Sequence, residues 1–473
     1  MRSSIAWAAL VTLALTRSIF ALEGTVAIHD PSTVVECGGK WYVYGTGGTP
    51  LVSEDGWTWR PGVRAARTGA APDVIKIGGT YYMYISGVTM ISSKTLDPNS
   101  PDYKWEDGGR IAGADSDVDV NPIDPGCFLD PNDGTFWLTY GSYVGYLQVV
   151  QLDPKTGKRI QPAQKPVNLA INCEASTMIY HDGYYYVLAT HGSCCAGSDS
   201  GYHIVVGRSK KPTGPFVDNM GIDMIQGGGK LFATSSGRWV GPGHFGLIDP
   251  GDGVQKFSCH YEADLDHGGS SVLDIRPLLW KDGWPEPGDN LKAGTYQIQS
   301  ARSGKVLEIA VQSVAVGGGR GRGGRGARGA RGGPPVPVPD QDVAQVSKDW
   351  PAGNVDTRLT NYMLQAHQKW AITPVQDAGG YLGSPYFKIT VAGTDRALAA
   401  TKDGELVVLP SFTGGAEQLW RIDQFSDGTY RVGPKSVPDS KESMYLSAVG
   451  SGLATLSKYD PKSDKQHWNV KAP

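Results

Sequence analysis

Short runs of alternating apolar and polar residues, separated by Gly-containing turns, recur along the first 285 residues. Each unit has a polar head, an apolar strand, a Gly turn and a second strand rich in Tyr, Trp or Phe, a pattern typical of a β-hairpin. The units begin HDPSTVVECGG at His29, APDVIKIGG at Ala71, IDPGCFLDPNDG at Ile123, CEASTMIYHDG at Cys173 and GHFGLIDPGDG at Gly243. Repetition at this period predicts an all-β fold that begins with a five-bladed β-propeller over residues 24–285.

The polar heads of the five units are Asp30, Asp73, Asp124, Glu174 and His244. Equivalent positions in a radial array of blades meet around one axis, so residues far apart in the sequence converge on one patch. Four acids and one histidine at such positions predict a concave acidic site. The alternative is that each Asp caps its own turn, because Asp-Pro is a common turn opener.

A second repeat follows the linker WPEPGDN and ends the chain. It reads HQKWAI, EQLWRI and KQHWNV, with Trp370, Trp420 and Trp468 each two residues after a Gln. Three such units predict a β-trefoil over residues 292–473, with the Trp side chains in its core. A Gly/Arg/Ala run and PPVPVP interrupt the first unit. Neither can pack a core, so we expect a disordered loop at 317–339.

Charge argues against a nucleic-acid partner. The formal net charge is −3, and five arginines lie in the tract at 320–331, so the remaining residues carry −8. A protein that binds a phosphate backbone would present a basic face. An Arg-Gly tract can bind RNA, and deletion of residues 317–333 tests that alternative. We expect the deletion to leave the activity nearly unchanged.

The N-terminus resembles a secretory signal peptide over residues 1–21. Arg2 gives a positive start, and a short apolar core leads to a cleavage site after Ala21. The apolar core is too short to span a bilayer, which needs about 20 residues. We therefore expect a secreted, monomeric protein with no membrane segment after cleavage. Oxidising conditions permit disulfides, and the adjacent Cys194 and Cys195 leave open a vicinal bridge or bridges to other cysteines.

A trio of carboxyl groups at one axis suits the hydrolysis of a glycosidic bond. That reaction needs one carboxylic acid to protonate the leaving oxygen and one carboxylate opposite it. Burial or a neighbouring carboxylate must raise the pKa of the acid so that it stays protonated near neutral pH. Abundant aromatic residues also suit a protein that stacks sugar rings, although aromatics fill β cores as well.

Several motifs in order resemble glycoside hydrolase family 43, and the closing LDIRPLLWKDGWP most resembles its arabinan-cleaving branch. They are HDPST at 29–33, APDV around Asp73, NPIDPG at 121–126, CEAS at 173–176 and GPGH ending at His244. The resemblance implies an inverting mechanism. Asp30 would be the general base, Glu174 the general acid, and Asp124 the group that raises the pKa of Glu174.

The resemblance also implies ligands around the acids. Asp73 and His29 would contact substrate, and His244 would hold a Ca²⁺ ion near the axis, whereas no organic cofactor is needed. One histidine is a poor all-protein calcium cage, so water would have to complete the coordination. Two departures weaken the assignment of substrate more than that of reaction: Val120–Asn121–Pro122 before the second acid, and Ala175–Ser176 after the third.

The C-terminal repeat resembles the ricin-B-type lectin domain, carbohydrate-binding family 13. The chain is thus interpreted as a secreted glycosidase that hydrolyses α-1,5-linked L-arabinan or arabino-oligosaccharides of plant polysaccharide. The alternatives are an exo-α-L-arabinofuranosidase, a β-xylosidase or a galactanase of the same family, and a non-catalytic protein with two sugar-binding modules. A trefoil kept only for structural support also stays open.

Overall fold

The computed structural model describes residues 22–113, 121–311, 342–450 and 452–473. The predicted signal peptide and the predicted loop at 317–339 lie outside these residues. Nearly all regular structure is β, as predicted; the α-helix of the described part is α1 Val343–Val346, and the remaining helices are short 3-10 turns. None of the described helices is long and apolar enough to cross a bilayer.

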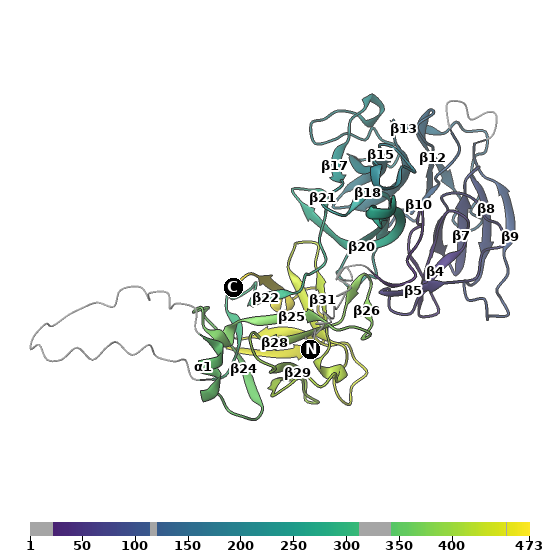
Figure 1. Cartoon of the computed structure of the whole chain (residues 1–473). Coiled ribbons are helices and arrows are strands. Elements are labelled where there is room, and N and C mark those ends of the chain that lie inside the picture. Colours follow the sequence, from purple (N-terminus) through teal and green to yellow (C-terminus); the bar gives the residue numbers. More distant parts are fainter. Residues whose placement is uncertain (1–21, 114–120, 312–341, 451) are drawn as a thin grey trace, which may run out of the picture.

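The first half of the chain forms the five blades of a β-propeller (Figure 1), which confirms the predicted architecture. Blades 2 to 5 each have four strands in chain order, and blade 1 has a fifth because β1 pairs in parallel with β5. Blade 1 contains β1 Glu23–Gly24, β2 Val35–Cys37, β3 Lys40–Tyr44, β4 Pro50–Ser53 and β5 Thr58–Pro61. Blade 2 contains β6 Asp73–Ile77, β7 Thr80–Ile85, β8 Thr89–Ser93 and β9 Glu106–Arg110.

The remaining blades follow the same plan. Blade 3 contains β10 Gly126–Leu129, β11 Phe136–Tyr140, β12 Tyr146–Leu152 and β13 Val167–Ile171. Blade 4 contains β14 Glu174–His181, β15 Tyr184–His191, β16 His203–Ser209 and β17 Lys230–Ala233. Blade 5 contains β18 Val240–Ile248, β19 Lys256–Ala263, β20 Ser270–Lys281 and β21 Trp284–Pro287.

Sequence chemistry explains the hairpins and the packing between blades. The turn between the first two strands of blade 1 is Gly38–Gly39, and that of blade 2 is Gly78–Gly79, all with positive φ, as type I′ hairpins require. Tyrosines of the second strands then join neighbouring blades: Tyr81 donates to the Glu36 carbonyl at 2.8 Å, and Tyr84 to the Gly157 carbonyl at 2.7 Å.

The ring closes where the first described residues meet the last blade. Ile28 N–H donates to the Ser271 carbonyl at 3.0 Å, and Leu273 N–H donates to the Val26 carbonyl at 2.9 Å. Backbone hydrogen bonds between the two ends of the propeller sequence therefore join blade 1 to blade 5.

The C-terminal half is a second β region. Six of its strands pair in a closed ring, in the order β22, β25, β28, β31, β32, β35 and back to β22. They are β22 Gly294–Ser300, β25 Trp370–Pro374, β28 Phe387–Val391, β31 Trp420–Gln424, β32 Tyr430–Pro434 and β35 Trp468–Lys471. Three two-stranded pairs extend from it: β23 Val306–Ile309 with β24 Val355–Thr360, β29 Ala397–Ala400 with β30 Leu406–Leu409, and β33 Tyr445–Val449 with β34 Leu453–Ser457.

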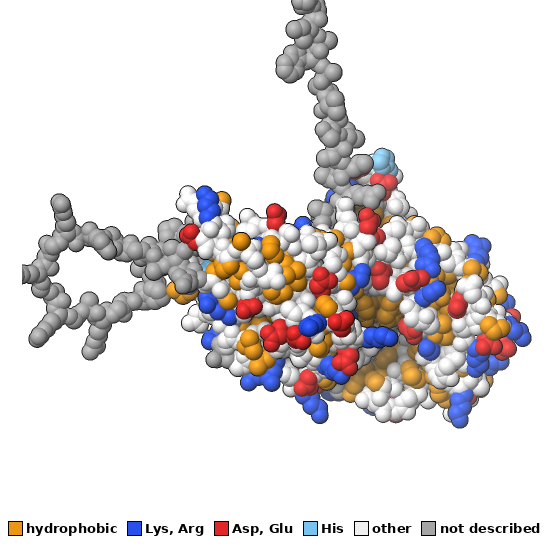
Figure 2. All heavy atoms as spheres, turned by 90° about the horizontal axis from the view of Figure 1, so that it is seen from below, with side chains coloured by type: hydrophobic (Ala, Val, Ile, Leu, Met, Phe, Trp, Pro, Cys, Tyr) orange, Lys and Arg blue, Asp and Glu red, His pale blue; other side chains and the backbone are white. Residues whose placement is uncertain are grey.

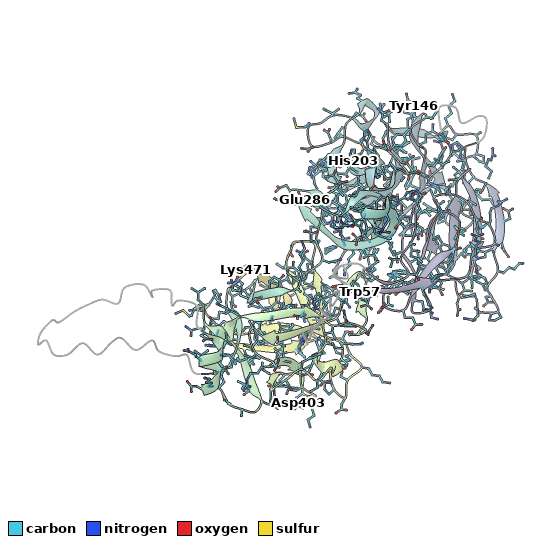
Figure 3. The ribbon with its side chains drawn as sticks, viewed as in Figure 1. Trp57, Tyr146, His203, Glu286, Asp403 and Lys471 are labelled. Carbon is cyan, nitrogen blue, oxygen red and sulfur yellow. A yellow bond between two sulfur atoms is a disulfide. The ribbon has the colours of Figure 1, made fainter. Side chains whose placement is uncertain are left out.

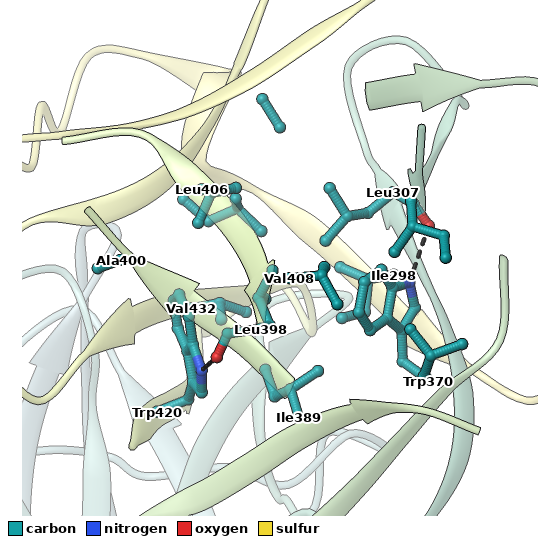
Figure 4. Close-up of a cluster of buried hydrophobic side chains, with 14 of the residues drawn as sticks. Ile298, Leu307, Trp370, Ile389, Leu398, Ala400, Leu406, Val408, Trp420 and Val432 are labelled. Carbon is teal, nitrogen blue, oxygen red and sulfur yellow. Dashed lines mark hydrogen bonds between the residues drawn. The ribbon is translucent and has the colours of Figure 1, made fainter. Parts of the chain in front are cut away.

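The three repeated tryptophans lie in the core of this region, as expected; Figure 4 labels Trp370 and Trp420. Each indole N–H donates to the carbonyl of a leucine on one of the three pairs: Trp370 to Leu307, Trp420 to Leu398 and Trp468 to Leu446, at 2.8, 3.0 and 2.8 Å. Equal contacts in three units show that the sequence repeat is also a structural repeat.

A hairpin of the C-terminal region inserts into the propeller. It consists of β26 Gly380–Tyr381 and β27 Ser384–Pro385, on the side of the region that faces the propeller in Figure 1. Its tip residue, Leu382, is fully buried in the same cluster as Trp57 and Ile275 of blades 1 and 5; Figure 3 labels Trp57 at this junction. Leu382 N–H donates to the Asp55 carbonyl at 2.8 Å, and its own carbonyl accepts from Lys256 Nζ at 2.7 Å.

Buried charges hold the same junction. Lys256 Nζ of blade 5 lies 3.4 Å from Asp423 Oδ1 of β31. Arg431 Nη2 lies 2.7 Å from Asp252 Oδ2 and 3.1 Å from Asp423 Oδ2, and Arg421 Nη2 lies 3.2 Å from Asp252 Oδ2. Elsewhere, acidic and basic side chains are interspersed over the surface, which is hollowed between the two regions on the face in Figure 2. The two halves are thus docked by specific contacts.

Candidate active site

In every blade, a residue with left-handed backbone conformation lies before the first strand or within it. These residues are Asp30, Ala71, Asp124, Ala175 and His244, with φ of 50°, 46°, 54°, 51° and 61°. Non-glycine residues rarely adopt this conformation, so its fivefold recurrence identifies the equivalent positions of the blades. Three of the five predicted heads therefore occupy equivalent positions. Asp73 lies two residues after the equivalent position of its blade, and Glu174 lies one residue before the equivalent position of its own. These two heads were misplaced because the sequence alone does not show which residue adopts the left-handed conformation.

Asp30 is surrounded by imidazole rings. Its Oδ1 lies 3.2 Å from His244 Nδ1, 3.4 Å from His29 Nε2 and 3.9 Å from His260 Nδ1. The Asp30 backbone N–H donates to His260 Nδ1 at 3.1 Å, and Thr46 Oγ1 donates to Asp30 Oδ2 at 2.7 Å. This carboxyl group from blade 1 is therefore held by histidines from both ends of the propeller chain.

These contacts fix the charge of the cluster. Burial alone would raise the pKa of Asp30, but the attraction and hydrogen bond of His244 hold it well below its usual range. Burial would lower the pKa of His244, but Asp30, with Asp124 and Glu174 behind it, raises that pKa to about 9. Burial lowers the pKa of His260 to about 3. Near neutral pH the site thus contains an Asp30 carboxylate, a His244 imidazolium and a neutral His260.

Glu174 lies at the start of β14 and is buried between two hydroxyl groups. Ser142 Oγ donates to its Oε2 at 2.7 Å, and the Tyr202 hydroxyl donates to its Oε1. Burial and the Glu174 charge hold the pKa of Tyr202 well above its usual range, so the phenol stays a donor. Both oxygens of Glu174 are therefore oriented by fixed partners.

Asp124 precedes blade 3 and is also buried. Burial is the main cause that raises its pKa to about 7; the nearby charges of Glu174 and Asp30 raise it further, and His244 opposes them. Like charges close together cannot all ionise. The Asp124 carboxyl therefore holds its proton to a much higher pH than an ordinary aspartate does.

Asp73 is the first residue of β6 and is buried. One carboxylate oxygen accepts from Thr33 N–H at 2.8 Å and the other from Cys127 N–H at 2.7 Å. Burial raises its pKa. Because both oxygens bind the backbone of the neighbouring blades, the contacts favour a role in joining blades 1, 2 and 3.

His29 lies at the mouth of the cluster. Ser271 Oγ donates to Glu262 Oε1 at 2.8 Å, and its oxygen lies 3.0 Å from His29 Nδ1. Because Ser271 gives its hydroxyl proton to Glu262, His29 Nδ1 is the donor to Ser271 Oγ, and His29 Nε2 faces Asp30. His29 Nε2 also lies 3.9 and 3.7 Å from the sulfurs of Cys194 and Cys195.

Those two cysteines form a disulfide with each other, which resolves the alternative left open by the sequence. The four other cysteines are free and buried: Cys37, Cys127, Cys173 and Cys259. The bridge lies in the loop after β15, close to the predicted base and its histidines.

Four further residues contact the candidate acids and were not predicted from the sequence: Thr46, Ser142, Tyr202 and His260. Thr46 and Ser142 follow the second strand of their blades, Tyr202 precedes the third strand of blade 4, and His260 lies within β19. None is a strand head, so the repeat gave no signal for them. The Gly-Thr-Gly and Tyr-Gly-Ser endings of the second strands were the only cue available.

The surroundings of His244 do not form a calcium cage from protein atoms. Its Nδ1 is engaged by Asp30, while the oxygens of Asp30 and Glu174 already accept hydrogen bonds or ion-pair contacts. Calcium takes six to eight oxygen ligands, so water would have to supply nearly all of them. The groups of described residues that could share a metal contain His29 with Asp30 and His260, or with Cys194 and Cys195, and not His244. The calcium site stays a prediction.

Comparison with known proteins identifies the family of the propeller. The family described as Glycosyl hydrolases family 43 matches residues 40–285, just over half of the chain. The extracellular exo-α-(1→5)-L-arabinofuranosidase ArbA of Cellvibrio japonicus is 35% identical over 306 residues, which cover 55% of this chain and 86% of that protein. The extracellular endo-α-(1→5)-L-arabinanase 1 of Bacillus subtilis is 30% identical over 292 residues, which cover 54% of this chain and 87% of that protein.

Solved structures agree. The α-L-arabinanase of Cellvibrio cellulosa superposes with a TM-score of 0.51 at 31% identity, over 57% of this chain and all of that one. Its complex with arabinohexaose gives the same TM-score and identity over 56% of this chain and 96% of that one. These matches account for the propeller and leave the C-terminal β region outside. By its sequence, its five blades and its relatives, this chain is an arabinanase-like glycoside hydrolase and belongs to glycosyl hydrolase family 43.

Proposed function

We propose that the protein is a secreted, inverting glycosidase that hydrolyses α-1,5-linked L-arabinan or arabino-oligosaccharides. The observation that carries this proposal is the pair of charge states around the axis: an Asp30 carboxylate held by His244, and a protonatable Asp124 beside Glu174. An inverting mechanism needs these two opposite states at once.

Asp30 is the general base. Its low pKa keeps it ionised over the whole neutral range, so it can orient a water molecule and take a proton as that water attacks the anomeric carbon. Thr46 holds one carboxylate oxygen, and the histidines face the other. The water therefore approaches from the side of blade 1.

Glu174 is the general acid, and Asp124 supplies its protonation. The charge of Glu174 helps to raise the pKa of Asp124 to about 7, so Asp124 is a carboxyl group near Glu174 that can hold a proton near neutral pH. Ser142 and Tyr202 fix the Glu174 carboxyl where it can pass that proton to the leaving sugar oxygen. His29 contacts substrate at the cleft mouth, while Asp73 supports the strands beneath it.

The relatives support arabinan as substrate and an extracellular location. The names of the two relatives describe an extracellular exo-α-(1→5)-L-arabinofuranosidase and an extracellular endo-α-(1→5)-L-arabinanase. Exo-arabinofuranosidase activity is therefore the second candidate here, favoured by the higher identity to ArbA.

The C-terminal region is proposed to be a β-trefoil of the ricin-B type that binds polysaccharide. A closed ring of six strands, three two-stranded pairs and three equivalent tryptophans support the fold. Its limits, residues 292–473, and those of the propeller, residues 24–285, are part of the proposal.

Replacement of the acid tests the proposal. Glu174→Gln keeps the size of the side chain and should lower arabinan hydrolysis about 10³-fold, within the range general acids contribute, without loss of polysaccharide binding. Glu106→Gln, at an exposed position of β9, is the matched control and should be as active as the parent. Product sizing on linear arabinan separates endo from exo action, and NMR of the first product reports inversion. A fully active Glu174→Gln protein, or release of xylose alone from mixed substrates, would contradict the assignment.

A further inference from the structure

The Cys194–Cys195 disulfide lies at the open edge of the site. Both cysteines are exposed, and their sulfurs lie 3.9 and 3.7 Å from His29 Nε2, which in turn lies 3.4 Å from Asp30 Oδ1. Two sulfur atoms are thus placed one side chain away from the proposed base. They form an apolar surface among polar groups.

Stabilisation of the fold does not explain a bridge of this kind. A disulfide stabilises mainly by closing a loop in the unfolded chain, and the effect grows with the length of that loop. A bridge between neighbouring residues closes the shortest loop possible. Its effect is therefore local, on the shape and chemistry of the segment that carries it.

Metal binding does not explain it either. His29 and the two sulfurs lie close enough together to share an ion, but soft metals bind the charged thiolate. In the disulfide each sulfur is bonded to the other and carries no such charge. The pair is an uncharged, polarisable group with no hydrogen to donate.

Hydrogen bonds and close backbone packing hold the loop that carries the bridge in place. Ser198 N–H donates to the Gly268 carbonyl of blade 5 at 2.9 Å, and Ser200 Oγ donates to the Ser193 carbonyl at 3.3 Å. Gly192 lies so close to the Gly201 carbonyl that a Cβ there would be 2.1 Å from its oxygen. The loop then ends at Tyr202, which binds Glu174. One anchored segment thus places the disulfide beside the base and a phenol on the acid.

We propose that the Cys194–Cys195 disulfide is a sugar-contacting wall of the active-site cleft, which receives the apolar C–H face of an uncharged sugar residue bound next to Asp30. This rests on the proposed glycosidase function. Sugars offer C–H faces as well as hydroxyl groups, and binding sites match both with an apolar surface and a few polar groups. Sulfur, being polarisable, makes favourable dispersion contacts with such a surface. His29 and Asp30 supply the polar groups next to it.

The test compares binding with turnover in the full-length protein. In a Glu174→Gln background, arabinotriose binding is measured by calorimetry with and without Cys194→Ser and Cys195→Ser together. Loss of the apolar wall should weaken binding about tenfold, the effect of one good apolar contact of about 1.4 kcal/mol. In the active protein the same pair of substitutions should raise KM by a similar factor and change kcat less than twofold.

Reductant gives an independent measurement. Because the four other cysteines are free in the structure, a mild phosphine should act on the parent only through this bridge and raise its KM. The doubly substituted protein is the matched control and should not respond. A pH profile of kcat that stays in place shows that Tyr202 still holds Glu174.

Three outcomes would overturn the proposal: unchanged arabinotriose binding, unchanged KM, or a fall in kcat with a shifted pH profile, which is what a purely structural loop would give. Failure of the proposed function looks different. In that case the parent would release no arabinose while the binding comparison between bridged and substituted proteins could still be made.

Discussion

Leu382 connects the two halves of the molecule, and its truncation should loosen the propeller. Its side chain is fully buried with Trp57 and Ile275, although it belongs to the C-terminal region. A buried Leu→Ala substitution costs about 3–5 kcal/mol because the cavity is only partly refilled. At about 2 °C per kcal/mol for a region of this size, Leu382→Ala should lower the melting temperature of the propeller by about 6 °C or more.

Thermal inactivation of the proposed arabinan hydrolysis reports this effect, because the candidate active site lies in the propeller. Leu453→Ala is the matched control: the same chemical change, in the same C-terminal region, at a side chain that is half exposed. It should leave the inactivation temperature within about 1 °C, as surface substitutions usually do. If the Leu382→Ala protein is inactivated at the same temperature as the parent, the β26–β27 hairpin does not stabilise the propeller, and the prediction is refuted.

Three further predictions concern charged groups. The pKa of Asp124 is raised to about 7, so its ionisation lowers the free energy of unfolding as pH rises from about 4 through 7. The Asp124→Asn protein should therefore unfold at a higher denaturant concentration than the parent at pH 8 but not at pH 4. It should also lose activity. The pKa of Asp423 is lowered to about 2, so the stability that its charge contributes is present above pH 4 and is lost as pH falls towards 2. Asp423→Asn should lower the free energy of unfolding by about 3 kcal/mol at pH 7, as measured by urea unfolding. A dinitrophenyl arabinofuranoside needs no acid assistance, so it should restore turnover in Glu174→Gln and not in Asp30→Asn.

The propeller could be predicted from the sequence because its signal is local and repeated. Strand alternation, Gly turns and aromatic second strands are properties of each unit, and five copies make chance agreement improbable. The exact equivalence of the heads could not be predicted. It depends on which residue takes the left-handed turn, Ala71 and Ala175 in two blades, and alanine gives no sequence cue for that conformation.

The sequence repeat singled out only candidate residues at or next to the head of a blade, Glu174 and His29 among them. Asp30, Asp124 and His244 are such heads, whereas Tyr202 and His260 reach the same place from a loop and from the second strand of blade 5. Such residues are brought in by the packing of neighbouring blades, which no single-unit pattern encodes. The pairing of the cysteines was left open for a similar reason. Which cysteine lies near which depends on the path of the loop after β15, and the sequence does not show that path.

The junction alters how the C-terminal region would assist hydrolysis. A module on a flexible linker raises the local substrate concentration whatever its orientation. Here Arg431 is fully buried between Asp252 and Asp423, which belong to different halves of the chain, and separation of the halves would expose or unpair these charges. Breaking one partner of a buried ion pair costs about 3–5 kcal/mol, so the halves stay together in the native state. A polysaccharide bound on the C-terminal region would then have one fixed direction relative to the cleft, and that direction, rather than linker length, would decide which chains reach Asp30.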